Sequence, residues 1–136
     1  MAQAVANHMI AHEEGGSIIN MASIMAHRAS LEIAAYCASK AAIEQLTTAL
    51  AVEVAKKGIR VNALAPGFIP TDMTRDYLKM DETLRGGKVK RAIPVGRYGE
   101  IHELDGPLLL LASDVGSFMT GSTLVVDGGQ SSYIDG

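Results

Sequence analysis

The stretch IRVNALAPG, at residues 59–67, is the segment from which the fold of this chain can be worked out. It is rich in apolar side chains and keeps no strict polar–apolar alternation, which is typical of a strand buried on both faces of a parallel sheet. Pro66 and Gly67 form a turn signal that ends it. We therefore expect a buried strand over residues 59–65, with its carboxyl end at this turn.

Helical and strand-like segments alternate on both sides of this strand. The predicted helices span residues 1–13, 36–57 and 100–112, and the other predicted strands span residues 17–23 and 122–129, the last together with its turn. The apolar stripe of the first helix comprises Val5 and Met9 with Ala2 and Ala6. The apolar stripe of the second helix comprises Ile43, Leu46, Leu50 and Val54. Such alternation predicts parallel strands joined by right-handed crossovers, so the expected fold class is α/β with helices on both faces of the sheet.

Two further segments have clear local signals. Lys56 and Lys57 favour the carboxyl end of a helix, and Gly58 can take the left-handed conformation that caps it. Residues 71–91 are polar and charged, and they predict a helical excursion from the core, called the lid below. No repeat or flexible linker marks a second unit, so the 136 residues should form one domain or a part of one.

The composition limits the classes of function. The chain is 48% hydrophobic and 20% charged, as globular proteins are. Its net charge of −3 disfavours nucleic acid as the main partner, and no apolar run approaches the roughly 20 residues of a membrane-spanning helix. The single cysteine, Cys37, excludes an internal disulfide and suits a reducing compartment. We therefore expect a cytoplasmic protein that binds neither nucleic acid nor membrane.

Two patterns that can carry chemistry do not predict a site here. His8 and His12 are four residues apart, but no carboxylate stands between them as in the zinc motif His-Glu-x-x-His, so we predict no metal site. Cys37 lacks the His and Asn partners of a cysteine nucleophile.

Polar residues follow the predicted strands where ligands bind in open α/β sheets, beyond the carboxyl ends. Ser23 closes the first predicted strand, and Pro66 with Gly67 follows the second. Tyr36 and Lys40 open the helix after the first strand. These residues should therefore converge on one rim of the sheet.

Tyr36 and Lys40 are four residues apart, so they are neighbours on one helix face. They could be a plain surface pair or an acid–base couple. A free phenol has a pKa of about 10, and a nearby ammonium favours its ionised form. Such a tyrosine could exchange a proton with a substrate oxygen that Ser23, thirteen residues earlier, would hold by a hydrogen bond.

An ordered set of motifs resembles the short-chain dehydrogenases/reductases. The set comprises SIINMAS at 17–23, the Tyr-x-x-x-Lys motif YCASK at 36–40, GIRVNALAPGFIPTDM at 58–73, PVGRYGEIHELDGPLLLLASD at 94–114 and MTGSTLVVDGG at 119–129. The resemblance covers nearly the whole chain. It implies a doubly wound, Rossmann-type parallel sheet, of which three strands are predicted here.

The resemblance also implies an activity: an oxidoreductase that interconverts an alcohol and a carbonyl with NAD or NADP. Tyr36 would be the acid/base, Lys40 would support it, and Ser23 would position the substrate oxygen. The cofactor-binding residues would be Tyr36, Lys40, Pro66, Gly67, Ile69 and Thr71. The lid at 71–91 would cover a small-molecule substrate whose identity the sequence leaves open. Family members assemble as homo-oligomers through the helix with Tyr36 and Lys40 and the helix before it.

The chain also departs from the family pattern. The Gly-x-x-x-Gly-x-Gly turn that receives the cofactor pyrophosphate does not occur in it, nor does the asparagine expected just before residue 1. Residues 1–136 therefore resemble a single partial domain, the C-terminal half of the fold, with an open strand edge that a missing N-terminal half would cover. The alternatives are a non-catalytic remnant acting as an oligomerisation or interaction module, and an epimerase or dehydratase of the wider superfamily.

Overall fold

The computed structural model describes residues 1–13, 15–84 and 86–133. Within them, three parallel strands form one sheet, β1 (Gly16–Met21), β2 (Ile59–Pro66) and β3 (Thr123–Val126). The α-helices are α1 (Ala2–Ala11), α2 (Ala34–Val54), α3 (Arg75–Leu84), α4 (Lys88–Arg91) and α5 (Asp105–Ala112). Short 3-10 helices are η1 (Ile24–Ala26), η2 (Ala55–Lys57), η3 (Ile101–Leu104), η4 (Asp114–Gly116) and η5 (Gln130–Ser132). The predicted α/β fold with parallel strands is confirmed.

Strand β2 is the centre of the sheet, with β1 on one side and β3 on the other. Residues 61–65 of β2 are fully buried, which explains their apolar character. Asn62 is the polar exception: its amide donates to the carbonyl of Met119 at 2.8 Å and accepts from the backbone N–H of Ser122 at 3.0 Å. Asn62 therefore holds the chain that leads into β3 against the central strand.

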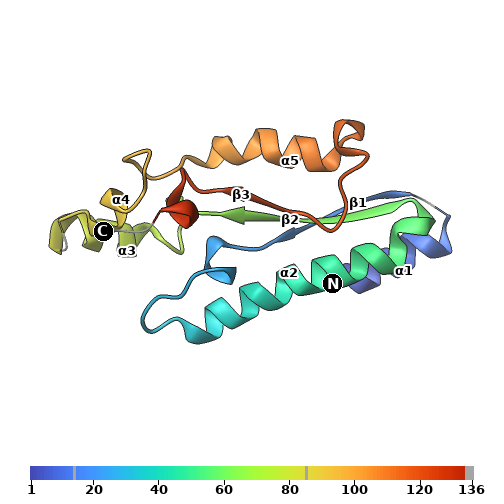
Figure 1. Cartoon of the computed structure of the whole chain (residues 1–136), viewed down its shortest axis with the longest axis horizontal. Helices are drawn as coiled ribbons and strands as arrows, with labels where there is room; N and C mark the ends of the chain where they lie inside the picture. The colour runs from blue at the N-terminus through green and yellow to red at the C-terminus, as the bar shows by residue number, and fades with distance from the viewer. Residues whose placement is uncertain (14, 85, 134–136) are drawn as a thin grey trace.

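Helices cover the sheet on both sides, with α1 and α2 on one face and α5 on the other (Figure 1). The core of the first face is made of Ala6, Ile18, Leu50, Ala51, Val54, Ile59 and Val61. On the other face, the hydroxyl of Ser17 donates to the carbonyl of Leu111 at 2.8 Å, which ties β1 to α5. Burying a Val or Leu side chain stabilises a fold by about 1.5–3 kcal/mol, so these contacts supply most of the stability.

Some predicted boundaries and stripes need correction. β1 ends at Met21, so Ser23 lies beyond the strand, and the helix predicted over residues 100–112 begins as the 3-10 helix η3. Leu46 is 50% exposed and Val5 37% exposed, although both were assigned to packed stripes. On α2 the buried residues are Thr47, Leu50, Ala51 and Val54. Leu46 lies roughly 100° around the axis from Thr47, which turns it away from the sheet.

The lid consists of two helices, α3 and α4, beyond the carboxyl ends of the strands (Figure 1). Its inner side is anchored by Asp81, a fully buried carboxylate on α3. Both carboxylate oxygens accept from the backbone N–H of Val89, at 3.1 and 3.0 Å. The lid is therefore held together by a buried polar contact as well as by apolar packing.

Candidate active site

Ser23 lies where β1 leaves the sheet. The backbone N–H of Ala22 still donates to Leu64 of β2 at 2.8 Å, and Ser23 then begins the turn of η1. Its hydroxyl oxygen accepts from the backbone N–H of Met25 at 3.2 Å, and the residue is only 8% exposed. This capping bond fixes the direction of the Ser23 side chain at the carboxyl end of β1.

Tyr36 and Lys40 lie in the first two turns of α2, on the same side of the helix. The Lys40 ammonium is 5.6 Å from the centre of the Tyr36 ring and donates to the carbonyl of Met21 at 2.9 Å. Met21 is the last residue of β1, and α2 packs against η1. Lys40 therefore connects the tyrosine ring to the strand end that Ser23 follows.

The segment after β2 completes the rim. Pro66 is the last residue of β2, and the N–H of Gly67 donates to the carbonyl of Val126 at 2.9 Å. A Cβ on Gly67 would lie 2.7 Å from the Cβ of Asp127, so only glycine fits there. Because β1 and β2 are parallel neighbours, Pro66 and Gly67 share the sheet edge from which the chain leads to Ser23.

Ile69 and Thr71 lie further along this segment. Ile69 is buried, with its Cγ1 close to Gly99. The backbone N–H of Thr71 donates to the hydroxyl of Thr74 at 2.8 Å, and that hydroxyl donates to the carbonyl of Ile69 at 2.7 Å. These bonds hold residues 69–74 in a fixed turn that leads into the lid.

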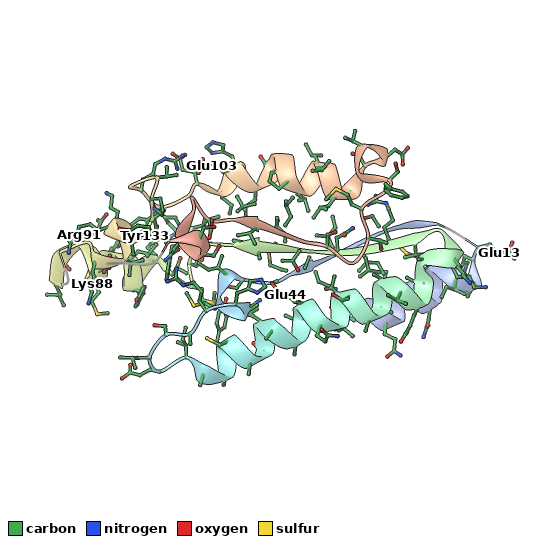
Figure 2. The ribbon with its side chains drawn as sticks, in the orientation of Figure 1. Glu13, Glu44, Lys88, Arg91, Glu103 and Tyr133 are labelled. Carbon is green, nitrogen blue, oxygen red and sulfur yellow. The ribbon has the colours of Figure 1, made fainter. Side chains whose placement is uncertain are left out.

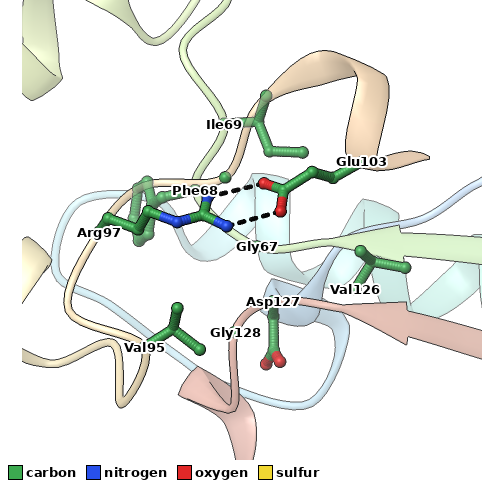
Figure 3. Close-up of a pocket in the computed structure, with 10 residues that line it drawn as sticks. Gly67, Phe68, Ile69, Val95, Arg97, Glu103, Val126, Asp127 and Gly128 are labelled. Carbon is green, nitrogen blue, oxygen red and sulfur yellow. Dashed lines mark hydrogen bonds and ion pairs between the residues drawn. The ribbon is translucent and has the colours of Figure 1, made fainter. Parts of the chain in front are cut away.

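A cavity of about 110 Å³ lies between the ends of β2 and β3 and the loop before η3 (Figure 3). Across it Arg97 makes two hydrogen bonds to the Glu103 carboxylate, at 2.8 and 2.7 Å. These bonds and the backbone N–H of Glu100 lower the pKa of Glu103 to about 2. The ion pair closes this loop over Gly67, a structural role that the sequence patterns did not reveal.

A second cavity, of about 260 Å³, lies between the lid and the loop after β1. Its lining includes Met25, Arg28, Phe68, Asp81, Lys88 and Gln130. Asp81 accepts a further hydrogen bond from the Tyr98 hydroxyl at 3.0 Å, and burial together with this bond raises the pKa of Tyr98 to about 12. The sequence analysis missed Arg28, Asp81 and Gln130, because their partners lie far away along the chain.

Two kinds of feature are absent from the part of the chain that the structure describes. No helix in residues 1–13, 15–84 and 86–133 is long and apolar enough to cross a membrane. Within the same residues, no three His, Cys, Asp or Glu side chains come together as a metal-ion site would require. Cys37 is a free, partly buried thiol.

Comparisons with known proteins give matches over nearly the whole chain. A family model described as enoyl-(acyl carrier protein) reductase matches residues 1–131. A 2-dehydro-3-deoxy-D-gluconate 5-dehydrogenase of Escherichia coli (strain K12) is 41% identical over 95% of this chain and 50% of that protein. The chain spans about half the length of the curated relatives it matches.

Solved structures of similar proteins superpose closely. A gluconate 5-dehydrogenase of Burkholderia cenocepacia J2315, in complex with NADP and tartrate, is 41% identical, with a TM-score of 0.90 over 98% of this chain and 51% of that one. A short-chain type dehydrogenase/reductase of Mycobacterium marinum is also 41% identical, with a TM-score of 0.86 over 95% of this chain and 50% of that one. With the family model and the Tyr-x-x-x-Lys geometry, these matches show that the chain belongs to the short-chain dehydrogenase/reductase family.

Proposed function

We propose that this chain is the catalytic half of a nicotinamide-dependent oxidoreductase that interconverts an alcohol and a carbonyl. The observation that carries the proposal is the position of the Lys40 ammonium, which faces the Tyr36 ring and binds the carbonyl of Met21 beside Ser23. A structural surface pair would not need a buried, capped serine at the same strand end. The whole arrangement suits proton transfer to a substrate oxygen.

In this proposal Tyr36, Ser23 and Lys40 have separate chemical roles. In reduction the Tyr36 hydroxyl donates its proton to the substrate oxygen, and in oxidation the ionised Tyr36 takes the hydroxyl proton back. The Ser23 hydroxyl donates to the same oxygen and stabilises its developing charge. The Lys40 ammonium, 5.6 Å from the centre of the Tyr36 ring, holds its charge beside the group that exchanges the proton.

The residues present also suit the nicotinamide end of NAD or NADP, which when bound exchanges a hydride with the substrate carbon. An ammonium has three donors, and Lys40 uses one on Met21, which leaves two for ribose hydroxyls. Pro66 and Gly67 would form the wall beside the ring, with Ile69 and Thr71 near its carboxamide. The pyrophosphate turn is not among these residues, so we propose that a further Rossmann half pairs with the free edge of β1.

We also propose that the protein is a cytoplasmic homo-oligomer that uses α2 as a contact surface. Leu46 is 50% exposed and Val52 is 78% exposed on this helix. The two side chains lie within two turns of each other along α2, and grouped exposed apolar side chains are typical of an interface. The same surface supports the alternative function, an interaction module without catalysis, so binding of the cofactor must decide between them.

The deciding experiment joins this chain to the preceding half of the Escherichia coli relative and measures reduction of a carbonyl by NADPH or NADH. We expect turnover, and we expect Tyr36→Phe to lower kcat at least about 100-fold, the usual contribution of a general acid. Tyr133→Phe is the matched control, because Tyr133 lies outside the proposed site. Turnover that survives Tyr36→Phe would refute the assignment of Tyr36 as the acid. A hybrid that binds no nicotinamide and shows no turnover would refute the catalytic proposal and favour the interaction module.

A further inference from the structure

The larger cavity contains polar groups that the proposed proton transfer does not use. It adjoins the catalytic strand end, since Met25 lines it and donates its N–H to the Ser23 hydroxyl. Phe68, next to Gly67, forms another part of its wall. A molecule bound here would lie next to the turn that holds Ser23, although Ser23, Tyr36 and Lys40 are not among the lining residues.

Two cations reach this cavity from different elements. Arg28 comes from the loop after β1 and Lys88 from the start of α4 in the lid. One guanidinium nitrogen of Arg28 donates to the carbonyl of Gln130, and a guanidinium has five N–H donors in all. Arg28 and Lys88 therefore keep donors for an anion that lies between the loop and the lid.

Among the described residues that line the cavity, Asp81 is the one carboxylate, and its oxygens are already engaged. Asp81 accepts from the Val89 N–H of the lid and from the Tyr98 hydroxyl of the loop before η3, so its oxygens are largely satisfied. Arg28 and Lys88 together outweigh its charge. The described lining therefore has an excess of positive charge, which favours an anionic ligand.

Gln130 adds a second, independent indication. It is only 6% exposed, and among the described residues its side-chain oxygen has no hydrogen-bond partner. A buried acceptor without a partner costs roughly 1–3 kcal/mol, which a ligand hydroxyl would recover. Since Gln130 lines the cavity, the missing donor is best supplied from within it.

We propose that this cavity binds a small hydroxylated carboxylate, with its carboxylate between Arg28 and Lys88 and a hydroxyl donating to the Gln130 side-chain oxygen. The inference rests on the proposed function, because it makes this molecule the substrate. The volume of about 260 Å³ is about nine times the share of one water in the liquid, which suits a sugar acid better than a long acyl chain.

The test is a titration of the isotope-labelled 136-residue chain, followed by amide chemical shifts at constant ionic strength. The probes are D-gluconate and D-glucitol, which share a six-carbon polyol chain and differ in the carboxylate, and D-glucitol 6-phosphate. We expect gluconate to bind at least about tenfold more tightly than glucitol, because each charged hydrogen bond contributes about 1.5–3 kcal/mol. Gluconate should shift the amides around Arg28, Lys88 and Gln130.

Variants separate the two parts of the site. Lys88→Met should weaken gluconate binding about tenfold and leave glucitol unchanged, whereas Gln130→Met should weaken both ligands. Lys57→Met is the matched control, because it removes the same charge from η2. This part of the molecule lies at the end where Figure 2 labels Glu13, opposite the end with Lys88 and the lid. This control should bind like the wild type. The dispersion of the amide spectrum verifies that each variant is folded.

Equal affinity for gluconate and glucitol, no effect of Lys88→Met, or binding of the phosphate ester alone would overturn the proposal. Binding is read without turnover, so the inference and the proposed catalysis can fail separately. If Tyr36→Phe keeps its activity while gluconate still binds through Lys88, only the assignment of the acid is wrong. If gluconate does not bind while Tyr36→Phe abolishes turnover, only the substrate class is wrong.

Discussion

The hydrogen bond between the Tyr98 hydroxyl and Asp81 can be removed by Tyr98→Phe, a change that deletes one oxygen. The bond is 3.0 Å long and runs from the loop before η3 to a fully buried carboxylate in the lid. Without it, the N–H of Val89 is the one hydrogen-bond partner that the Asp81 side chain keeps among the described residues. The lid that carries Asp81 and Lys88 should then be held less firmly over the larger cavity.

The magnitude follows from the charge of the acceptor and the exposure of the donor. A hydrogen bond to a charged group contributes about 1.5–3 kcal/mol, and Tyr98 is partly exposed, so we expect a loss of about 1.5 kcal/mol at pH 8. Burial and the bond to Asp81 raise the pKa of Tyr98 from 10.0 to about 12. A raised pKa means that the stabilisation is complete below pH 10 and is lost as the pH rises toward 12. This loss amounts to at most about 1.4 kcal/mol per pH unit.

Urea unfolding of the wild type and of Tyr98→Phe, measured between pH 8 and pH 11, tests this reasoning. The difference in the free energy of unfolding should be about 1.5 kcal/mol at pH 8 and largely gone at pH 11. Tyr133→Phe, at a tyrosine that is 43% exposed, should change little at either pH. A difference below about 0.5 kcal/mol at pH 8, or one that does not shrink with pH, would refute the assigned contact.

Three further predictions concern the cavity shown in Figure 3. Gly67→Ala should lower the free energy of unfolding by about 1–3 kcal/mol, because the new Cβ would lie 2.8 Å from the Cα of Asp127, whereas Gly106→Ala, with nothing within 4 Å, should not destabilise. Arg97→Met should raise the pKa of Glu103 from about 2 toward 4.5 in a carbon-detected NMR titration. An unchanged pKa would show that the ion pair with Arg97 is not the cause of the low pKa of Glu103. Burial would raise the pKa of Asp127, but hydrogen bonds from Ser131 and from backbone N–H groups outweigh it and lower the pKa below 3.8. The stability advantage of the wild type over Asp127→Asn should therefore be complete above pH 3.8 and shrink as the pH falls below it; a constant difference in acid unfolding curves would contradict this.

Local physics made much of the fold predictable. Tyr36 and Lys40 face each other because residues four apart on a helix always do, whatever the rest of the chain contributes. Gly58 ends the helical segment after α2 with a φ of 70°, as its lack of a side chain predicts. The central strand β2 could be read from apolar residues alone, since a strand covered on both faces has few polar positions.

Other features depended on contacts between distant segments. The sequence predicted a strand over residues 17–23 with Ser23 at its carboxyl end, whereas β1 ends at Met21 and the Ser23 side chain caps the turn of η1. Leu46 was expected to be packed, but the direction from which the sheet meets α2 leaves it half exposed. In both cases the pattern of residue types was compatible with two local structures, and packing chose between them.

The sequence by itself determined the alternation of helices and strands, the central strand and the tyrosine–lysine pair, because each depends on residues a few positions apart. Only the tertiary structure decided that Asp81 would contact Tyr98, seventeen positions away in the sequence, and that Arg28 would contact Gln130, 102 positions away. Side chains so far apart meet only where the sheet and the lid bring their backbones together. The polar lining of the larger cavity is therefore a property of the fold, and no local sequence pattern predicts it.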